Sequence, residues 1–197
     1  MTTYLLAGGC DSQYEAYGSK LAAEVRKLHH GPLRILSCPF ASPRGDWERK
    51  FVSRKAWFHR FFGEHIDVHM AMPDNLEGQI SAAHVVYLHG GDGVLLSHFL
   101  APLGDPAKTF AGKIVVGSSA GANWLATTHW SGSWRTVRKG RGILPHAIMV
   151  HYGSRFFDDD PRGAIDWASA ESELRAALPE GAPITHIPEG AFITIAR

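Results

Sequence analysis

The chain has 197 residues, and its 20 Lys and Arg residues nearly balance its 19 Asp and Glu residues, which leaves a formal net charge of +1. A protein that binds nucleic acid through phosphates needs a clear surplus of basic groups, so this balance excludes a strongly basic nucleic-acid-binding domain. The length suits one hydrophobic core, and we expect residues 1–197 to form a single domain.

Cysteine and histidine usage gives no sign of a disulfide framework or a metal site. The two cysteines, Cys10 and Cys38, are too few for either, and the twelve histidines lack the H-E-x-x-H spacing of a helical zinc site. The N-terminal sequence has no signal-peptide pattern, and no apolar run approaches the ~20 residues of a membrane span. The sequence therefore predicts a cytoplasmic protein without a metal, a cofactor or a membrane partner.

Short apolar runs alternate with amphipathic segments along the chain, which is typical of βα units around a mostly parallel sheet. Apolar positions three and four residues apart predict helices over residues 13–29, 47–62, 120–129 and 164–178. The apolar runs predict strands at residues 4–7, 33–38, 66–70, 85–89, 113–117 and 147–151. Two short closing strands are expected at residues 183–187 and 191–195.

A serine motif lies between one of these strands and the next helix, where residues 117–121 read GSSAG. A serine at a sharp strand-to-helix turn exposes its hydroxyl, and the N-terminus of the following helix stabilises negative charge there. We therefore interpret Ser119 as a nucleophile. A structural glycine-rich turn or an anion-binding loop is the alternative interpretation.

Two further features complete a hydrolytic site. Paired glycines after strand 85–89 allow the amide of Gly91, together with that of Ala120, to form an oxyanion hole. A serine hydroxyl needs a base, and His151 ends strand 147–151, so we expect it at the same sheet edge as Ser119. The rival histidines are His89, His129 and His146.

These motifs together resemble peptidase family S51, which includes peptidase E (aspartyl dipeptidase) and cyanophycinase. The family pattern is a strand before G-G-[DN], a strand before G-x-S-A-G-A, and a strand that ends in histidine and an aromatic residue. Here these are residues 90–92, 117–122 and 151–152, and residues 188–191 (PEGA) are the last familiar piece. The resemblance implies a three-layer αβα, flavodoxin-like fold of the class I glutamine amidotransferase type. It also implies a serine peptidase without cofactor, acting through Ser119 and His151 on short peptides with an Asp at the scissile bond.

The sequence departs from the family where a carboxylate should follow the serine, because residues 106–157 contain no Asp or Glu. A carboxylate on the histidine fixes its tautomer and stabilises the imidazolium. Asp92 and the acidic run at residues 158–160, with Asp158 first, are the acids we expect to replace it. A neutral group on His151, or a loss of activity, stays open.

The same acid-free stretch carries seven Lys and Arg residues. A guanidinium near the cleft, from Arg155 or Arg138, could bind a substrate carboxylate in a bidentate manner. We therefore expect a small acidic peptide as the partner, and a homo-oligomer stays open.

Three other functions compete with a peptidase. A catalytically weakened or non-enzymatic binding homologue of the same fold is favoured by the missing acid. A small carboxylesterase is disfavoured because only one helix-strand unit separates Gly91 from Ser119. A glutamine amidotransferase is disfavoured because its nucleophile is cysteine, whereas position 119 holds serine.

Overall fold

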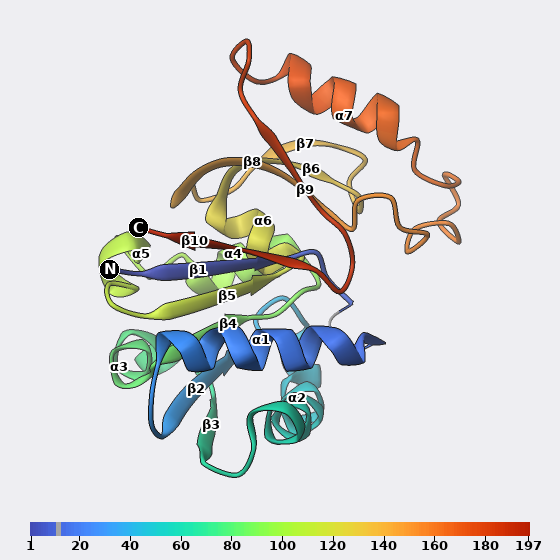
Figure 1. Cartoon of the computed structure of the whole chain (residues 1–197). Helices are drawn as coiled ribbons and strands as arrows, with labels where there is room; N and C mark the ends of the chain where they lie inside the picture. Colours follow the sequence, from blue (N-terminus) through green and yellow to red (C-terminus); the bar gives the residue numbers. More distant parts are fainter. Residues whose placement is uncertain (11–12) are drawn as a thin grey trace.

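Figure 1 shows the computed structural model of the chain, which describes residues 1–10 and 13–197. Within these residues a six-stranded sheet has the order β10-β1-β5-β4-β2-β3. All neighbouring strands pair in parallel except β10, which runs antiparallel to β1 at the edge. The strands are β1 (Thr3–Ala7), β2 (Leu33–Cys38), β3 (Ile66–Met70), β4 (Val85–Leu88), β5 (Ile114–Ser118) and β10 (Phe192–Ala196).

Helices cover both faces of this main sheet, and alternate residues of each strand point to opposite faces. In β1, for example, Leu5 packs with one hydrophobic cluster and Leu6 with the other. The cluster of Leu5 joins α1 (Glu15–Leu28) and α2 (Trp47–Phe62) to one face. The opposite face carries α3 (Leu76–Ala82), α4 (Gly93–Leu100), α5 (Pro106–Thr109) and α6 (Ala120–Leu125), and short 3₁₀ turns precede α2 (Arg44–Asp46) and α3 (Pro73–Asn75).

A second sheet, of order β7-β6-β8-β9 among the described residues, lies beyond α6. It consists of β6 (Ala126–Ser131), β7 (Thr136–Lys139), β8 (Leu144–Val150) and β9 (Ile184–Ile187). One face of this sheet packs on α6, and the other face is covered by α7 (Trp167–Ala176). Figure 1 shows the resulting layers, with α7 at one end of the molecule, and α1 and α2 at the other.

This second sheet corrects two predictions. The helix expected over residues 120–129 is wrong, because α6 ends at Leu125 and the chain continues directly as β6. The β-branched and aromatic residues of β6 favour a strand once a partner strand is present. Strand β8, expected in the main sheet, pairs with β6 and β9 instead. No helix in the described part of the chain is both long and apolar enough to span a membrane.

The connection from β9 to β10 crosses from the second sheet to the main sheet (Figure 1). This crossing, residues 188–191, is bound to the end of β1 by two backbone hydrogen bonds. The amide of Gly8 donates to the carbonyl of Ala191 at 3.0 Å, and the amide of Gly190 donates to the carbonyl of Gly9 at 3.2 Å. The crossing is therefore held at the carboxyl edge of the main sheet, where ligands collect in open α/β sheets.

Candidate active site

Ser119 lies at the turn between β5 and α6 in a backbone conformation that residues other than glycine rarely adopt. Its φ is 48° and its ψ is −104°. Its amide donates to the carbonyl of Ala7 at 2.9 Å, which ties the turn to β1. Such strain persists only where the surrounding structure enforces it, and it is the geometry of a serine held out at the top of a sheet.

His151 lies beside Ser119, although it comes from the other sheet. It follows β8, has a φ of 56°, and its amide donates to the carbonyl of Gly8 at 3.0 Å. The Oγ atom of Ser119 is 2.8 Å from its Nε2 atom. The two residues singled out from the sequence therefore lie within hydrogen-bond distance of each other. We expected them at the edge of one sheet, but they follow strands of two different sheets.

The acid on the far side of this histidine is Glu189, in the crossing between β9 and β10. Its Oε1 atom is 2.7 Å from Nδ1 of His151, and the two side chains are only 12% and 5% exposed. Burial opposes ionisation of Glu189, but hydrogen bonds from His151, Ser154 and Cys10 outweigh it and hold the pKa of this carboxyl below its usual value. Glu189 is therefore a carboxylate near neutral pH and accepts a hydrogen bond from Nδ1 of His151.

The acids expected to orient His151 bind elsewhere, so that prediction is wrong. The carboxylate of Asp92 caps α4 by accepting from the amides of Val94 and Leu95. Asp158 accepts from Nε of Arg155 at 2.9 Å. The sequence motif at residues 188–191 was the available signal for Glu189, but nothing in its spacing pointed to His151.

Asp160, the last acid of the same run, is bound by a basic side chain. The Arg162 guanidinium beside it holds the pKa of that carboxyl well below its usual value. Of the rival histidines, His89 is buried against Ser37, with its Nε2 atom 2.7 Å from the hydroxyl oxygen, and His129 is also buried. The histidine at hydrogen-bond distance from Ser119 is His151, at 2.8 Å.

Gly91 and Ala120 are the residues whose amides we expect to form an oxyanion hole. Ala120 is the first residue of α6, so its N–H has no partner within that helix. Gly91 has a φ of 137°, and a Cβ atom there would lie 2.2 Å from the carbonyl oxygen of Ala41, so only glycine fits. Both residues line a cavity of about 810 Å³ together with Ser119 and His151.

A second cavity, of about 510 Å³, opens from Ser119 and His151 towards α2, and we call it the α2 cavity. Arg49, Lys50 and Arg54 of α2 line it. The guanidinium of Arg54 lies over the rings of Trp57 and Tyr87, at 5.0 and 5.1 Å from the ring centres. Within residues 1–10 and 13–197, neither Lys50 nor Arg54 forms an ion pair with a carboxylate, so this side of Ser119 is positively charged.

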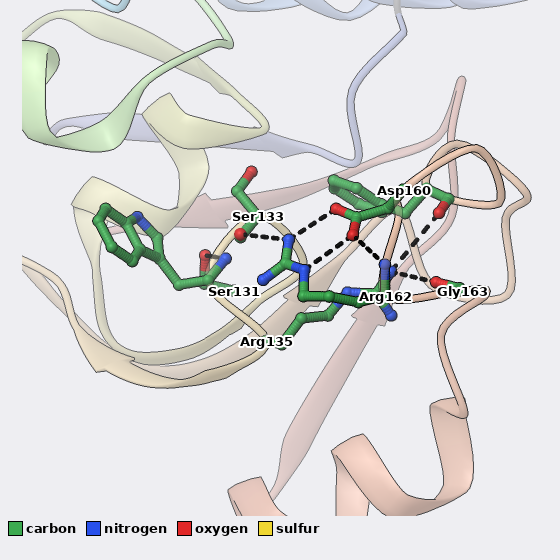
Figure 2. Close-up of polar contacts among 8 residues, drawn as sticks. Ser131, Ser133, Arg135, Asp160, Arg162 and Gly163 are labelled. Carbon is green, nitrogen blue, oxygen red and sulfur yellow. Dashed lines mark hydrogen bonds and ion pairs between the residues drawn. The ribbon is translucent and has the colours of Figure 1, made fainter.

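The loop after His151 covers its ring. Phe156 stacks on the imidazole with a centroid distance of 4.7 Å and an interplanar angle of 18°. Figure 2 shows how this loop is bound to the turn between β6 and β7. Arg162 binds the carboxylate of Asp160 at 2.6 Å and the carbonyl of Ser133 at 2.9 Å, and Arg135 donates to the carbonyl of Gly163. Phe156 thereby covers one face of the imidazole ring.

Comparison with known proteins agrees with this geometry. A family model described as Peptidase family S51 matches residues 4–195. The chain is therefore a serine-type hydrolase of the peptidase class. It belongs to peptidase family S51.

Two solved structures share the fold. A peptidase from an acI-B1 Actinobacterium aligns with a TM-score of 0.69 and 18% identity over 99% of this chain and 83% of that one. A putative peptidase E protein from Listeria monocytogenes EGD-e aligns with a TM-score of 0.65 and 14% identity over 99% of this chain and 98% of that one. No curated protein sequence matches the chain.

Proposed function

We propose that the chain is a serine peptidase in which Ser119 is the nucleophile, His151 the general base and Glu189 the group that orients the base. The observation that carries this proposal is the continuous hydrogen-bonded series from Ser119 Oγ to His151 Nε2, and from His151 Nδ1 to Glu189 Oε1. A hydroxyl is a poor nucleophile at neutral pH unless a base within hydrogen-bond reach removes its proton.

In the proposed reaction, Ser119 Oγ attacks the peptide carbonyl carbon while its proton passes to Nε2 of His151. The resulting oxyanion accepts hydrogen bonds from the amides of Gly91 and Ala120. The imidazolium, stabilised by the Glu189 carboxylate, then gives its proton to the leaving amine as the C–N bond breaks. Water, activated by the same histidine, attacks the acyl-enzyme and releases the acid product and free Ser119.

We further propose that the substrate carries an acidic side chain next to the scissile bond and that this side chain enters the α2 cavity. Lys50 and Arg54 supply positive charge there, and Arg54 is held in place by the aromatic rings beneath it. Arg138 lines the larger cavity on the other side of Ser119. Arg155 lines neither cavity, and its side chain is 93% exposed, so it has less support than Lys50 and Arg54 as a substrate contact.

The alternative of a non-enzymatic binding homologue rested on the missing acid, and Glu189 removes that reason.

The carboxylesterase alternative is tested by substrate preference. We expect dipeptides with N-terminal Asp to be hydrolysed faster than p-nitrophenyl esters of neutral acids, and a fluorophosphonate probe to label the wild type but not Ser119→Ala. Equal labelling of both proteins contradicts the nucleophile assignment, and preferential ester hydrolysis contradicts the peptidase.

A further inference from the structure

Three potential metal ligands from distant parts of the chain meet on the side of His151 away from Ser119. They are Cys10 after β1, His151 after β8, and Glu189 in the crossing from β9 to β10. One ligand atom of each, a thiol sulfur, a ring nitrogen and a carboxylate oxygen, lie within 4.8 Å of one another. The mechanism proposed above uses the histidine and the glutamate but gives the thiol no role.

The backbone holds these three side chains in a fixed relation. The carbonyl of Gly8 accepts from the amide of His151 at 3.0 Å, and the carbonyl of Gly9 accepts from the amide of Gly190 at 3.2 Å. His151 is itself one of these hydrogen-bonded residues, Cys10 directly follows Gly9, and Glu189 directly precedes Gly190. A cluster held by its backbone loses little conformational entropy when an ion binds, which favours binding.

We propose that Cys10, His151 and Glu189 form a binding site for Zn²⁺ and that zinc bound there switches the peptidase off. Thiolate, imidazole and carboxylate are the ligands that zinc prefers, and three protein ligands leave the fourth tetrahedral position for water. Bonds of ~2.3 Å to sulfur and ~2.0 to 2.1 Å to nitrogen and oxygen place tetrahedral ligand atoms roughly 3.3 to 3.6 Å apart. The three atoms now lie within 4.8 Å of one another, with Nδ1 of His151 and Oε1 of Glu189 2.7 Å apart. Shifts on the order of 1 Å, which open this pair and draw the sulfur in, therefore reach that spacing.

The inhibitory effect follows from where the protons go, and this part rests on the proposed function. When zinc binds Nδ1, the proton that His151 donates to Glu189 passes to solvent, Nε2 takes up a proton from solvent, and the Cys10 thiol loses its proton to solvent. A neutral imidazole bound to metal through Nδ1 carries its hydrogen on Nε2. That nitrogen then faces Ser119 Oγ as a donor and cannot accept the hydroxyl proton, so the serine stays unactivated.

Metal binding can be measured without activity. We would titrate the full chain with Co²⁺ and follow the near-ultraviolet thiolate-to-cobalt absorption, then measure Zn²⁺ affinity by competition with a chromophoric chelator. Cys10→Ser should abolish the absorption band and weaken zinc binding by about 100-fold or more, because the thiolate ligand is lost. The matched control is Cys38→Ala, since Cys38 is the second cysteine of the sequence and is buried in the core. Urea denaturation establishes that each variant is folded.

The zinc site and the proposed peptidase function can be tested independently of each other. Ser119→Ala should bind zinc with wild-type affinity, because Ser119 is not a ligand, and this outcome supports the site even if no peptide is cleaved. In the wild type, hydrolysis should fall over the same zinc concentrations that fill the site, and a chelator should restore it. A cobalt complex without the thiolate band, zinc affinity unchanged in Cys10→Ser, or full activity at saturating zinc would each overturn the proposal.

Discussion

Glu189 Oε1 lies 2.7 Å from Nδ1 of His151, across 38 residues of sequence. The two residues reach each other because β8 and β9 are neighbours in the second sheet, and the chain turns back towards the main sheet directly after β9. The acid that orients His151 therefore lies far after it in the sequence. The acids considered from the sequence lie before it (Asp92) or just after it (residues 158–160).

Glu189→Gln should lower kcat by about 10³- to 10⁴-fold with little change in KM, because an amide cannot stabilise the imidazolium and can favour the wrong histidine tautomer. Steady-state kinetics on an Asp-containing dipeptide measure this effect. Asp158→Asn is the matched control, and it should stay within about threefold of wild type since Asp158 pairs with Arg155. A loss in Asp158→Asn as large as that in Glu189→Gln would contradict the assignment.

Gly9→Ala should abolish most activity by displacing His151. A Cβ atom at Gly9 would lie 2.4 Å from Cε1 and 2.5 Å from Nε2 of the imidazole. We expect kcat/KM to fall at least about 10²-fold, because a displacement of ~1 Å is enough for such a loss. Gly31→Ala provides the control, since Gly31 has the same φ of 107° but nothing within 4 Å of its Cβ position. Both variants should lose about 1 kcal/mol of stability from backbone strain, and only Gly9→Ala should lose activity.

Arg54→Met should reduce kcat/KM for peptides with an acidic residue by about 10- to 100-fold, the equivalent of one charge-assisted hydrogen bond. Hydrolysis of a matched peptide with Asn in place of Asp should change far less. Arg60→Met removes a positive charge from the same helix at a residue that pairs with Glu15, and it should leave both rates unchanged. An equal loss of kcat/KM for the Asp and Asn peptides would show that Arg54 supports the structure of the cavity but does not bind the charged group of the substrate.

The free energy of unfolding should decrease as the pH falls from about 7 to about 4, partly through His129. Burial, with a smaller contribution from Arg138, lowers the pKa of this histidine to about 4. The unfolded chain binds a proton near its ordinary pKa of ~6.5 while the folded protein still excludes it, so stability is lost across that interval. By linkage the loss amounts to about 3 kcal/mol.

His129→Gln should remove this part of the pH dependence, whatever its effect on stability at pH 7.5. Urea denaturation at several pH values between 4 and 7.5 measures the slope. His30→Gln, at an exposed histidine, controls for the loss of one histidine. A slope in His129→Gln equal to that of the wild type would show that His129 does not carry the effect.

Local sequence patterns predicted the strands of the main sheet closely. Strands β2 and β3 have the predicted boundaries, and β1, β4 and β5 differ by one residue at one or both ends. The motif at Ser119 predicted a turn between strand and helix, and the structure has that turn. These features depend on hydrophobic periodicity and on the residues of short turns, and both can be recognised directly in the sequence.

What the sequence alone determined is the order of βα units, the serine turn and a histidine at a strand end. Only the tertiary structure decided that β6, β7, β8 and β9 form a sheet of their own, and that Glu189 meets His151. The physical reason is that strand pairing and the contact between distant loops depend on which surfaces are buried together. The hydrogen bonds from residues 188–191 to Gly8 and Gly9 set the position of the acid. No hydrophobic periodicity in residues 188–191 predicts these hydrogen bonds.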